Sequence, residues 1–293
     1  MKGIILAGGK GSRLYPMTKA VSKPLIPIYD KPMIYYSLSV LLQAGIRELI
    51  VITAPADLTA YQRLLGDGSH LGVRIDYGVQ KVPKGIADAF LIAEDFIAGD
   101  RSCLVLGDNL FYGANFANLL RAAASREKGA TIFGYPVKNA SAYGVVTFDR
   151  NQKVLSIEEK PKRPKSRYAV PGLYFYDENA VPLAKTLTPS GRGELEITAL
   201  NERYLQEGML HVQLLERGIA WLDTGTPEGM LNAAQYVEAV QSRQGLYIAC
   251  PEEIAWQQGF ITDEQLAAIG EELKMTEYGQ YLLSIRQMSE ERE

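Results

Sequence analysis

The chain has 293 residues, of which 47% are hydrophobic and 22% are charged, and its formal net charge is -3. This composition is typical of a globular protein whose core is large enough to fold without disulfides or a structural metal. The lack of a basic excess argues against a nucleic-acid-binding domain.

The two cysteines, Cys103 and Cys250, form no CxxC pair, and such isolated thiols are expected in the reducing cytosol. Only a few apolar residues precede the first glycine pair, too few for the core of a secretory signal. No segment approaches the roughly 20 apolar residues of a membrane span. We therefore expect a cytoplasmic protein that binds neither membranes nor nucleic acid.

The first part of the chain alternates short apolar runs with amphipathic segments. Strands are expected at residues 3–7, 49–53, 73–79 and 103–106, and helices at 33–44 and 86–96. Asp88 and Asp95 interrupt the apolar face of the second helix. The pattern predicts a mostly parallel sheet covered on both faces, whose ligands bind beyond the carboxyl ends of the strands. Residues 8–13 and 107–109 should therefore share one rim.

The character of the chain changes after residue 130. Short strands are expected at residues 130–136, 144–148, 154–158 and 169–176, with turns between them. They predict a β-rich insertion, about residues 130–222, that acts as a lid or holds a second substrate. Thr226 is a good helix N-cap with Pro227 after it, and residues 262–265 form a capping-box pattern. We therefore expect a catalytic domain over residues 1–225 and a helical region over residues 226–293.

Residues 6–14, Leu-Ala-Gly-Gly-Lys-Gly-Ser-Arg-Leu, directly follow the first expected strand. The glycines allow the backbone to turn sharply and to present N–H groups to an anion, and Lys10 and Arg13 add positive charge. An ordinary strand-to-helix turn is the alternative. The loop is no dinucleotide fingerprint, because Leu14 stands at the third glycine position, and it lacks the Walker A pattern.

Three further charged residues are candidates for phosphate or metal binding. Lys23 precedes a proline near the loop, Asp108 ends the fourth strand, and Asp223 lies in the segment Trp-Leu-Asp-Thr-Gly-Thr. Two carboxylates suffice for Mg²⁺ when substrate phosphates complete its ligand shell. The alternatives are a solvated surface lysine and two aspartates that only shape turns.

The remaining candidates for catalytic or binding residues are the charged end of one expected strand and the two histidines. Glu158 and Glu159 point to opposite faces of their strand, so they form no carboxylate dyad, and Lys160 after them can hold a phosphate. The two histidines, His70 and His211, have no Ser, Cys or Asp arrangement beside them. Histidine-based nucleophilic or acid–base chemistry is therefore not expected.

In their order and spacing, these segments resemble the bacterial glucose-1-phosphate thymidylyltransferases of the sugar nucleotidyltransferase family. The resemblance covers nearly the whole chain. It rests on the segments at residues 3–9, 29–36, 106–109, 159–161, 172–177, 192–198, 221–226 and 250–255.

The resemblance implies a Rossmann-like α/β fold and transfer of a thymidylyl group from dTTP to glucose 1-phosphate, with Mg²⁺ as cofactor. The implied catalytic residues are Arg13, Lys23 and Lys160. The implied nucleotide site comprises Gly8, Gly11, Ser12, Arg13, Gln80, Gly85 and Asp108, with Gln80 and Gly85 at the thymine edge. The implied sugar site comprises Asn109, Gly144, Glu159, Lys160, Val170 and Gly172. The implied metal ligands are Asp108 and Asp223.

The resemblance also implies a homotetramer inhibited at a second site by the end product of the dTDP-rhamnose route. An apolar stripe beyond Thr226 could serve that assembly or pack on the chain's own catalytic domain. It consists of Met230, Ala233, Ala234, Val237 and Val240.

Three other functions stay open on the sequence alone. A uridylyl- or cytidylyltransferase would share the loop and the aspartates. A non-catalytic sugar-nucleotide-binding subunit would share the fold, although it should have lost some of the charged residues. An NAD(P)-dependent oxidoreductase is disfavoured by the broken dinucleotide fingerprint.

Overall fold

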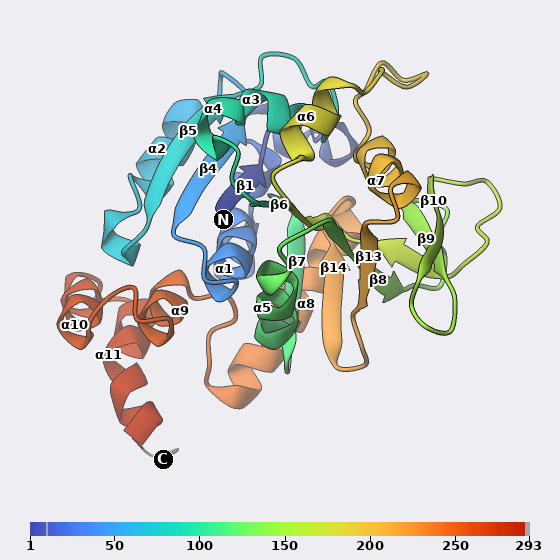
Figure 1. Ribbon diagram of the computed structural model, residues 1–293. Helices are drawn as coiled ribbons and strands as arrows, with labels where there is room; N and C mark the ends of the chain where they lie inside the picture. Colours follow the sequence, from blue (N-terminus) through green and yellow to red (C-terminus); the bar gives the residue numbers. More distant parts are fainter. Residues whose placement is uncertain (10, 291–293) are drawn as a thin grey trace.

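The computed structural model describes residues 1–9 and 11–290. Its centre is a ten-stranded mixed sheet with the order β10-β9-β11-β8-β12-β6-β1-β4-β5, in which β13 also pairs with β8 (Figure 1). Helices cover the sheet, which confirms the expected α/β class. None of the helices in the described ranges combines the length and the apolar character that a membrane crossing needs.

The parallel part of the sheet comes from the first third of the chain. It consists of β1 (Lys2–Leu6), β4 (Glu48–Thr53), β5 (Arg74–Val79) and β6 (Ser102–Leu106), which pair in parallel with one another. Alternate residues of β1 pack on opposite faces: Ile5 joins one buried core cluster and Ile4 the other. Burial on both faces explains why these strands are apolar throughout.

The later strands extend this sheet mostly in antiparallel fashion. They are β8 (Ala130–Pro136), β9 (Gly144–Phe148), β10 (Val154–Glu159), β11 (Tyr168–Val170), β12 (Leu173–Tyr176) and β13 (Leu210–Leu214). β12 pairs with both β6 and β8, so the β-rich segment continues the central sheet. The expectation of a single strand at residues 169–176 was wrong: the structure has β11 and β12 there. Pro171 lacks an N–H group, so the hydrogen-bonded ladder is interrupted between them.

Two short ribbons lie outside the main sheet. β7 (Asn109–Gly113) pairs antiparallel with β14 (Ile219–Asp223), and β2 (Pro27–Ile28) pairs with β3 (Lys31–Pro32). In the first ribbon Asp223 stands opposite Asn109. This register joins the end of the expected insertion to the end of β6.

The helices before residue 226 are α1 (Ile34–Gln43), α2 (Leu58–Leu65), α3 (Asp88–Ile92), α4 (Glu94–Ile97), α5 (Phe116–Ser125), α6 (Ala180–Lys185) and α7 (Ile197–Gln206). The helix expected at residues 86–96 is thus two short helices. They meet at Ala93, whose backbone (φ -90°, ψ 9°) leaves the α-helical region.

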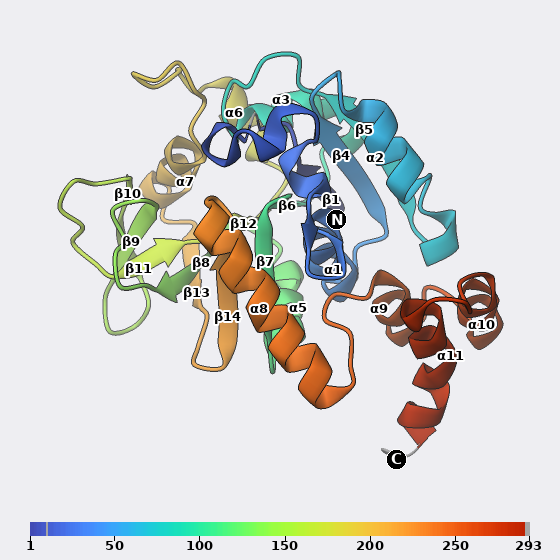
Figure 2. The ribbon, with the colours of Figure 1, turned by 180° about the vertical axis from the view of Figure 1, so that it is seen from behind.

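The C-terminal region contains α8 (Pro227–Gln244), α9 (Pro251–Gln257), α10 (Asp263–Glu272) and α11 (Glu277–Glu290). Thr226 caps α8 by accepting a hydrogen bond from the Gly229 N–H, and the capping box at Thr262 is present, as expected. Figure 2 shows α8 as a long helix and α9–α11 as a separate group that a connecting segment joins to it. The division into domains at residue 226 stays a prediction.

The apolar stripe of α8 packs within its own chain. Met230, Ala233 and Val237 are buried in a core cluster that also contains Leu14 and Met33. Ala234 and Val240 are partly buried and pack against the same cluster. The stripe is therefore covered without a second subunit and gives no support to an oligomer.

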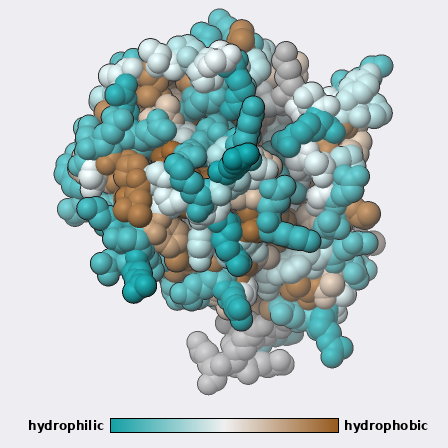
Figure 3. Space-filling model, turned by 90° about the vertical axis from the view of Figure 1, so that its right-hand side faces the viewer, coloured by the Kyte–Doolittle hydropathy of each residue, from teal (hydrophilic) through white to brown (hydrophobic). Residues whose placement is uncertain are grey.

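The surface on the side of β9 and β10 is mostly hydrophilic. In Figure 3, which shows the right-hand side of Figure 1, hydrophobic residues form only separate patches between charged and polar side chains. Scattered patches of this kind are normal on the surface of a soluble domain.

Arg47 connects the C-terminal helices to the part of the chain before residue 226. Its guanidinium donates to the Gly72 carbonyl at 2.9 Å and lies 4.7 Å from the centre of the Phe260 ring. Gly72 has φ +65°, and a Cβ there would lie 2.1 Å from the Phe260 carbonyl oxygen. Only glycine therefore allows this close approach of the two backbones.

We predict that Gly72→Ala lowers the free energy of unfolding by about 2–4 kcal/mol, because it adds both left-handed strain and a backbone clash. Gly45→Ala is the matched control: its φ is +79° but no atom lies within 4 Å of the added Cβ. The control should lose only about 1 kcal/mol. Urea unfolding measures both; equal losses would show that the contact with Phe260 contributes nothing.

Candidate active site

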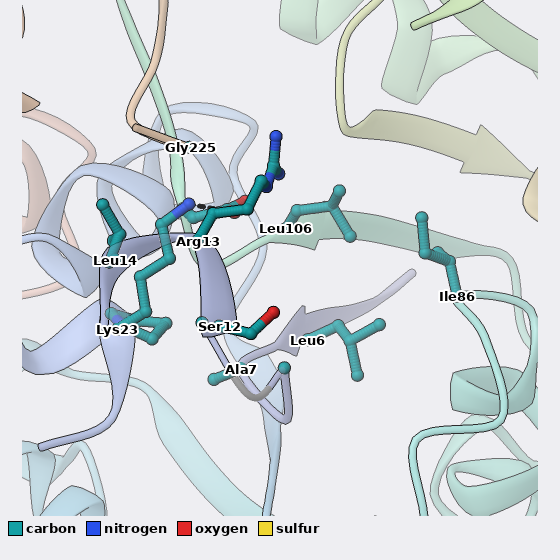
Figure 4. Close-up of a pocket in the computed structure, with 13 residues that line it drawn as sticks. Leu6, Ala7, Ser12, Arg13, Leu14, Lys23, Ile86, Leu106 and Gly225 are labelled. Atoms are coloured by element: carbon teal, nitrogen blue, oxygen red, sulfur yellow. Dashed lines mark hydrogen bonds and ion pairs between the residues drawn. The ribbon is translucent and has the colours of Figure 1, made fainter. Parts of the chain in front are cut away.

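Two adjoining cavities open beyond the carboxyl ends of β1 and β6. The smaller, about 290 Å³, is shown in Figure 4 and is lined chiefly by the glycine-rich loop, Lys23 and Asp108. The larger, about 680 Å³, extends toward the strands β9–β12. The residues common to both are Ser12, Arg13, Ile86, Leu106 and Asp108. The site lies at the rim that the sequence predicts.

The glycine-rich loop turns from β1 into a short 3-10 helix, Ser12–Leu14. Gly11 has φ +57°, and a Cβ there would lie 2.7 Å from Thr18 Cγ2, so a larger residue would strain the turn. Leu14 is buried beneath the turn, whereas Ser12 and Arg13 are exposed and line both cavities. The other expected cation of this loop, Lys10, lies outside the described residues.

Lys23 is buried and ion-paired. Only 7% of the residue is exposed, and its Nζ lies 2.6 Å from Asp108 Oδ2, a contact drawn as a dashed line in Figure 4. A buried ammonium requires a charged partner. The alternative of a solvated surface lysine is therefore wrong, and Lys23 contributes a charged side chain to the lining of the smaller cavity.

The β7–β14 ribbon brings the two candidate metal ligands to one place. Asp108 immediately precedes β7 and Asp223 ends β14 opposite Asn109. Thr224 Oγ donates to the Asp108 carbonyl at 2.8 Å, which ties the two strand ends together. Both aspartates line the larger cavity, although they are more than 100 residues apart in sequence.

Each of these carboxylates is oriented by neighbouring groups. Asp108 Oδ1 accepts from Asn109 Nδ2 at 3.0 Å. Asp223 Oδ1 accepts from the Gly225 N–H at 2.9 Å, and Oδ2 accepts from the Tyr143 hydroxyl at 3.1 Å. Burial, followed by the charge of Asp223, raises the pKa of Tyr143 to about 12, so the hydroxyl remains a donor at neutral pH.

This donor set fits Mg²⁺ better than a softer metal. Among residues 1–9 and 11–290, no group of three or more His, Cys, Asp or Glu side chains is placed to hold a metal ion. Mg²⁺ commonly takes only one or two carboxylates and completes its shell with phosphate oxygens and water. The oriented pair Asp108 and Asp223, beside a cavity with room for phosphates, meets that requirement.

Arg13 and Asp223 both lie close to Gly225. A Cβ on Gly225 would lie 3.1 Å from Arg13 Nη2 and 3.0 Å from Asp223 Oδ1. The glycine therefore makes room for the guanidinium beside the carboxylate. Cationic and anionic groups thus alternate where the two cavities join.

The residues expected to bind sugar all line the larger cavity: Asn109, Gly144, Glu159, Lys160, Val170 and Gly172. Glu159 Oε2 accepts from Thr198 Oγ at 2.6 Å, while its Oε1 lies 3.4 Å from Lys160 Nζ. Asn109 Oδ1 accepts from the Trp221 indole at 2.6 Å and from the Gly172 N–H at 3.1 Å. The polar groups of this pocket are held in fixed orientations.

Gln80 and Gly85 form a separate polar cluster with Gly8. A Cβ on Gly8 would lie 2.9 Å from Gln80 Oε1, and Gln80 Nε2 lies 3.4 Å from the Gly85 carbonyl oxygen. Gly85 has φ +104°, and a Cβ there would lie 2.4 Å from the Leu195 carbonyl. These three expected site residues are not among the described residues that line the cavities, although the chain neighbours of Gly8, Ala7 and Gly9, line the smaller one.

Several polar residues of the site were not predicted from the sequence. Thr198 and Arg192 lie in the polar run at residues 192–198, where their types alone could have indicated a role, and both contact Glu159. Nothing in the sequence pattern indicates Tyr143, because its partner Asp223 lies 80 residues away. Long-range pairing of this kind becomes visible only in the folded chain.

Comparison with known proteins agrees with this geometry. The family model described as nucleotidyl transferase matches residues 2–240. The glucose-1-phosphate thymidylyltransferase of Neisseria meningitidis is 58% identical over 97% of this chain and 99% of its own length. That of Mycobacterium tuberculosis is 53% identical over 97% and 99%, respectively.

A solved structure from Bacillus anthracis, assigned to the glucose-1-phosphate thymidylyltransferases and in complex with sucrose, is also similar. It is 41% identical in sequence with a TM-score of 0.74, and the match covers 80% of this chain and 94% of the other. The matching family model spans β1 to α8 and so includes both cavities. The chain therefore belongs to the nucleotidyl transferase family.

Proposed function

We propose that the chain transfers a thymidylyl group from dTTP to glucose 1-phosphate, giving dTDP-glucose and pyrophosphate. The observation that carries the proposal is the junction of the two cavities. One has the glycine-rich loop and Lys23 for a triphosphate, the other has Glu159 and Asn109 for sugar hydroxyls, and both contain Arg13 and Asp108. The relatives named above carry this activity in their names.

The reaction brings two anions together. An oxygen of the sugar phosphate attacks the α-phosphate in line, and pyrophosphate leaves on the opposite side. Arg13 and Lys23 on the triphosphate side, and Lys160 on the sugar side, offset the repulsion and hold the reactants in position. No general base is required because the attacking phosphate is already ionised.

Enzymes of this family generally use a divalent metal ion, and we propose Mg²⁺ held by Asp108 and Asp223. When bound, it would neutralise charge on the phosphates. Lys23 and Asn109 hold the Asp108 carboxylate, and Tyr143 and Gly225 hold that of Asp223. These contacts limit how far either ligand must move to bind the ion.

We also propose, from the resemblance, a cytoplasmic homotetramer inhibited by dTDP-rhamnose at a second site. Light scattering should give about four times the chain mass of 32.4 kDa. A monomer mass at micromolar concentration would contradict the assembly. Inhibition fully relieved by excess substrate would contradict a separate regulatory site.

The proposed reaction is tested by measuring pyrophosphate release with four nucleoside triphosphates and several sugar 1-phosphates. We expect the highest kcat/KM for dTTP with glucose 1-phosphate. A clear preference for UTP or CTP would favour the alternative transferases. No turnover with any pair would favour a non-catalytic subunit.

We predict that Arg13→Ala lowers kcat/KM on the order of a hundredfold, the usual effect of removing one charge partner of the transition state. The variant should fold, because Arg13 is exposed. Arg150→Ala, which removes an exposed arginine in the turn between β9 and β10, is the matched control. Wild-type turnover in Arg13→Ala would remove it from the mechanism.

We predict that Asp108→Asn and Asp223→Asn each abolish Mg²⁺-dependent turnover, since an amide is a poorer ligand than a carboxylate for a hard cation. Asp100→Asn, at an exposed position before β6, should leave the activity unchanged. The measurement is a titration of activity against Mg²⁺ concentration. Full activity of both site variants at limiting Mg²⁺ would place the metal elsewhere.

A further inference from the structure

Gln80 holds its side-chain oxygen close to Gly8, a residue of the glycine-rich loop. It directly follows β5 and is only 4% exposed. A Cβ on Gly8 would lie 2.9 Å from Gln80 Oε1, and the chain neighbours of Gly8, Ala7 and Gly9, both line the cavity. The glycine at position 8 therefore leaves space beside this oxygen that any other side chain would fill.

The nitrogen of the same amide is directed away from Gly8 by Asp88. Gln80 Nε2 donates to Asp88 Oδ2 at 2.9 Å and lies 3.4 Å from the Gly85 carbonyl oxygen. Asp88, the first residue of α3, is itself buried, with 9% of its surface exposed. Both neighbours of Nε2 are acceptors.

The two acceptors beside Nε2 fix the orientation of the Gln80 side-chain amide. A carboxylate and a carbonyl only accept hydrogen bonds, whereas the two ends of a glutamine amide differ, one donating and one accepting. A rotation by 180° would place Oε1 against the Asp88 carboxylate and leave two acceptors in contact, in a place with little water to separate them. Asp88 therefore decides which end of the amide faces Gly8.

We propose that Asp88 is a positioning residue that sets base selectivity by holding Gln80 with its oxygen available to the nucleotide base. The inference rests on the proposed function and on the expectation from the family resemblance that the base lies at Gln80. Thymine and uracil carry an N3–H donor, which this oxygen can accept. Cytosine has an unprotonated N3 acceptor at the same position and would face an acceptor, so it is rejected.

Asp88→Asn tests the inference, because an asparagine of the same shape can rotate its own amide and so tolerate either orientation of Gln80. The informative substrates are dUTP and dCTP, which share the deoxyribose and lack the thymine methyl group. We expect the ratio of their kcat/KM values to fall by about tenfold or more in the variant, the effect of losing one charge-assisted hydrogen bond. The KM for glucose 1-phosphate and the Tm should not change.

Asp95→Asn is the matched control, since it makes the same chemical change at an exposed position of α4. It should keep the wild-type ratio. The positioning role would be overturned if Asp88→Asn kept the wild-type ratio of kcat/KM for dUTP and dCTP, or if kcat/KM fell equally for both. The proposed function would still stand in that case, provided that the wild-type protein turns over dTTP. A wild-type protein without dTTP turnover would overturn the proposed function and the inference with it.

Discussion

The site depends on the register of β7 against β14. Asp108 lies at the end of β6 and Asp223 comes from a strand formed more than 100 residues later. Their meeting requires that β14 pair with β7 so that Asp223 stands opposite Asn109. A shift by one residue would turn Asp223 to the other face of the ribbon. The hydrogen bond from Thr224 to the Asp108 carbonyl holds the two ends together beyond the ladder.

The meeting of Asp108 and Asp223 also determines the balance of charge where the two cavities join. Lys23 is ion-paired with Asp108, and Arg13 and Asp223 both lie close to Gly225, so two cations and two carboxylates gather in the described part of the site. A triphosphate and a sugar phosphate bring several negative charges into this balanced group. A divalent cation between the carboxylates and the phosphates would offset part of that excess, which agrees with a reaction that needs positioning and charge compensation rather than acid–base catalysis.

Local features were predictable from the sequence, and long-range ones were not. The buried strands β1, β4 and β6, the loop glycines and the cap at Thr226 each depend on a short stretch of residues. The role of Asp88 depends on Gln80, and that of Tyr143 on Asp223, across turns whose geometry no local pattern encodes. The interruption of an apolar helix face by Asp88 was visible, but its partner was not. The family resemblance implied sugar contacts for residues such as Asn109 and Glu159, although their hydrogen-bond partners came only from the fold.

The continuity of the sheet bears on how the two substrates would meet. A lid is one of the roles expected for the segment at residues 130–222, yet β12 is hydrogen-bonded to β6 on one side and to β8 on the other. Gly172, just before β12, is tied to Asn109, just after Asp108, by a hydrogen bond of 3.1 Å. The strands of residues 130–222 and the parallel strands are thus parts of one sheet rather than two bodies joined by a hinge. Because a misplacement of about 1 Å can lower the rate of such a transfer on the order of a hundredfold, a shared sheet is a direct way to fix the distance between the reacting groups.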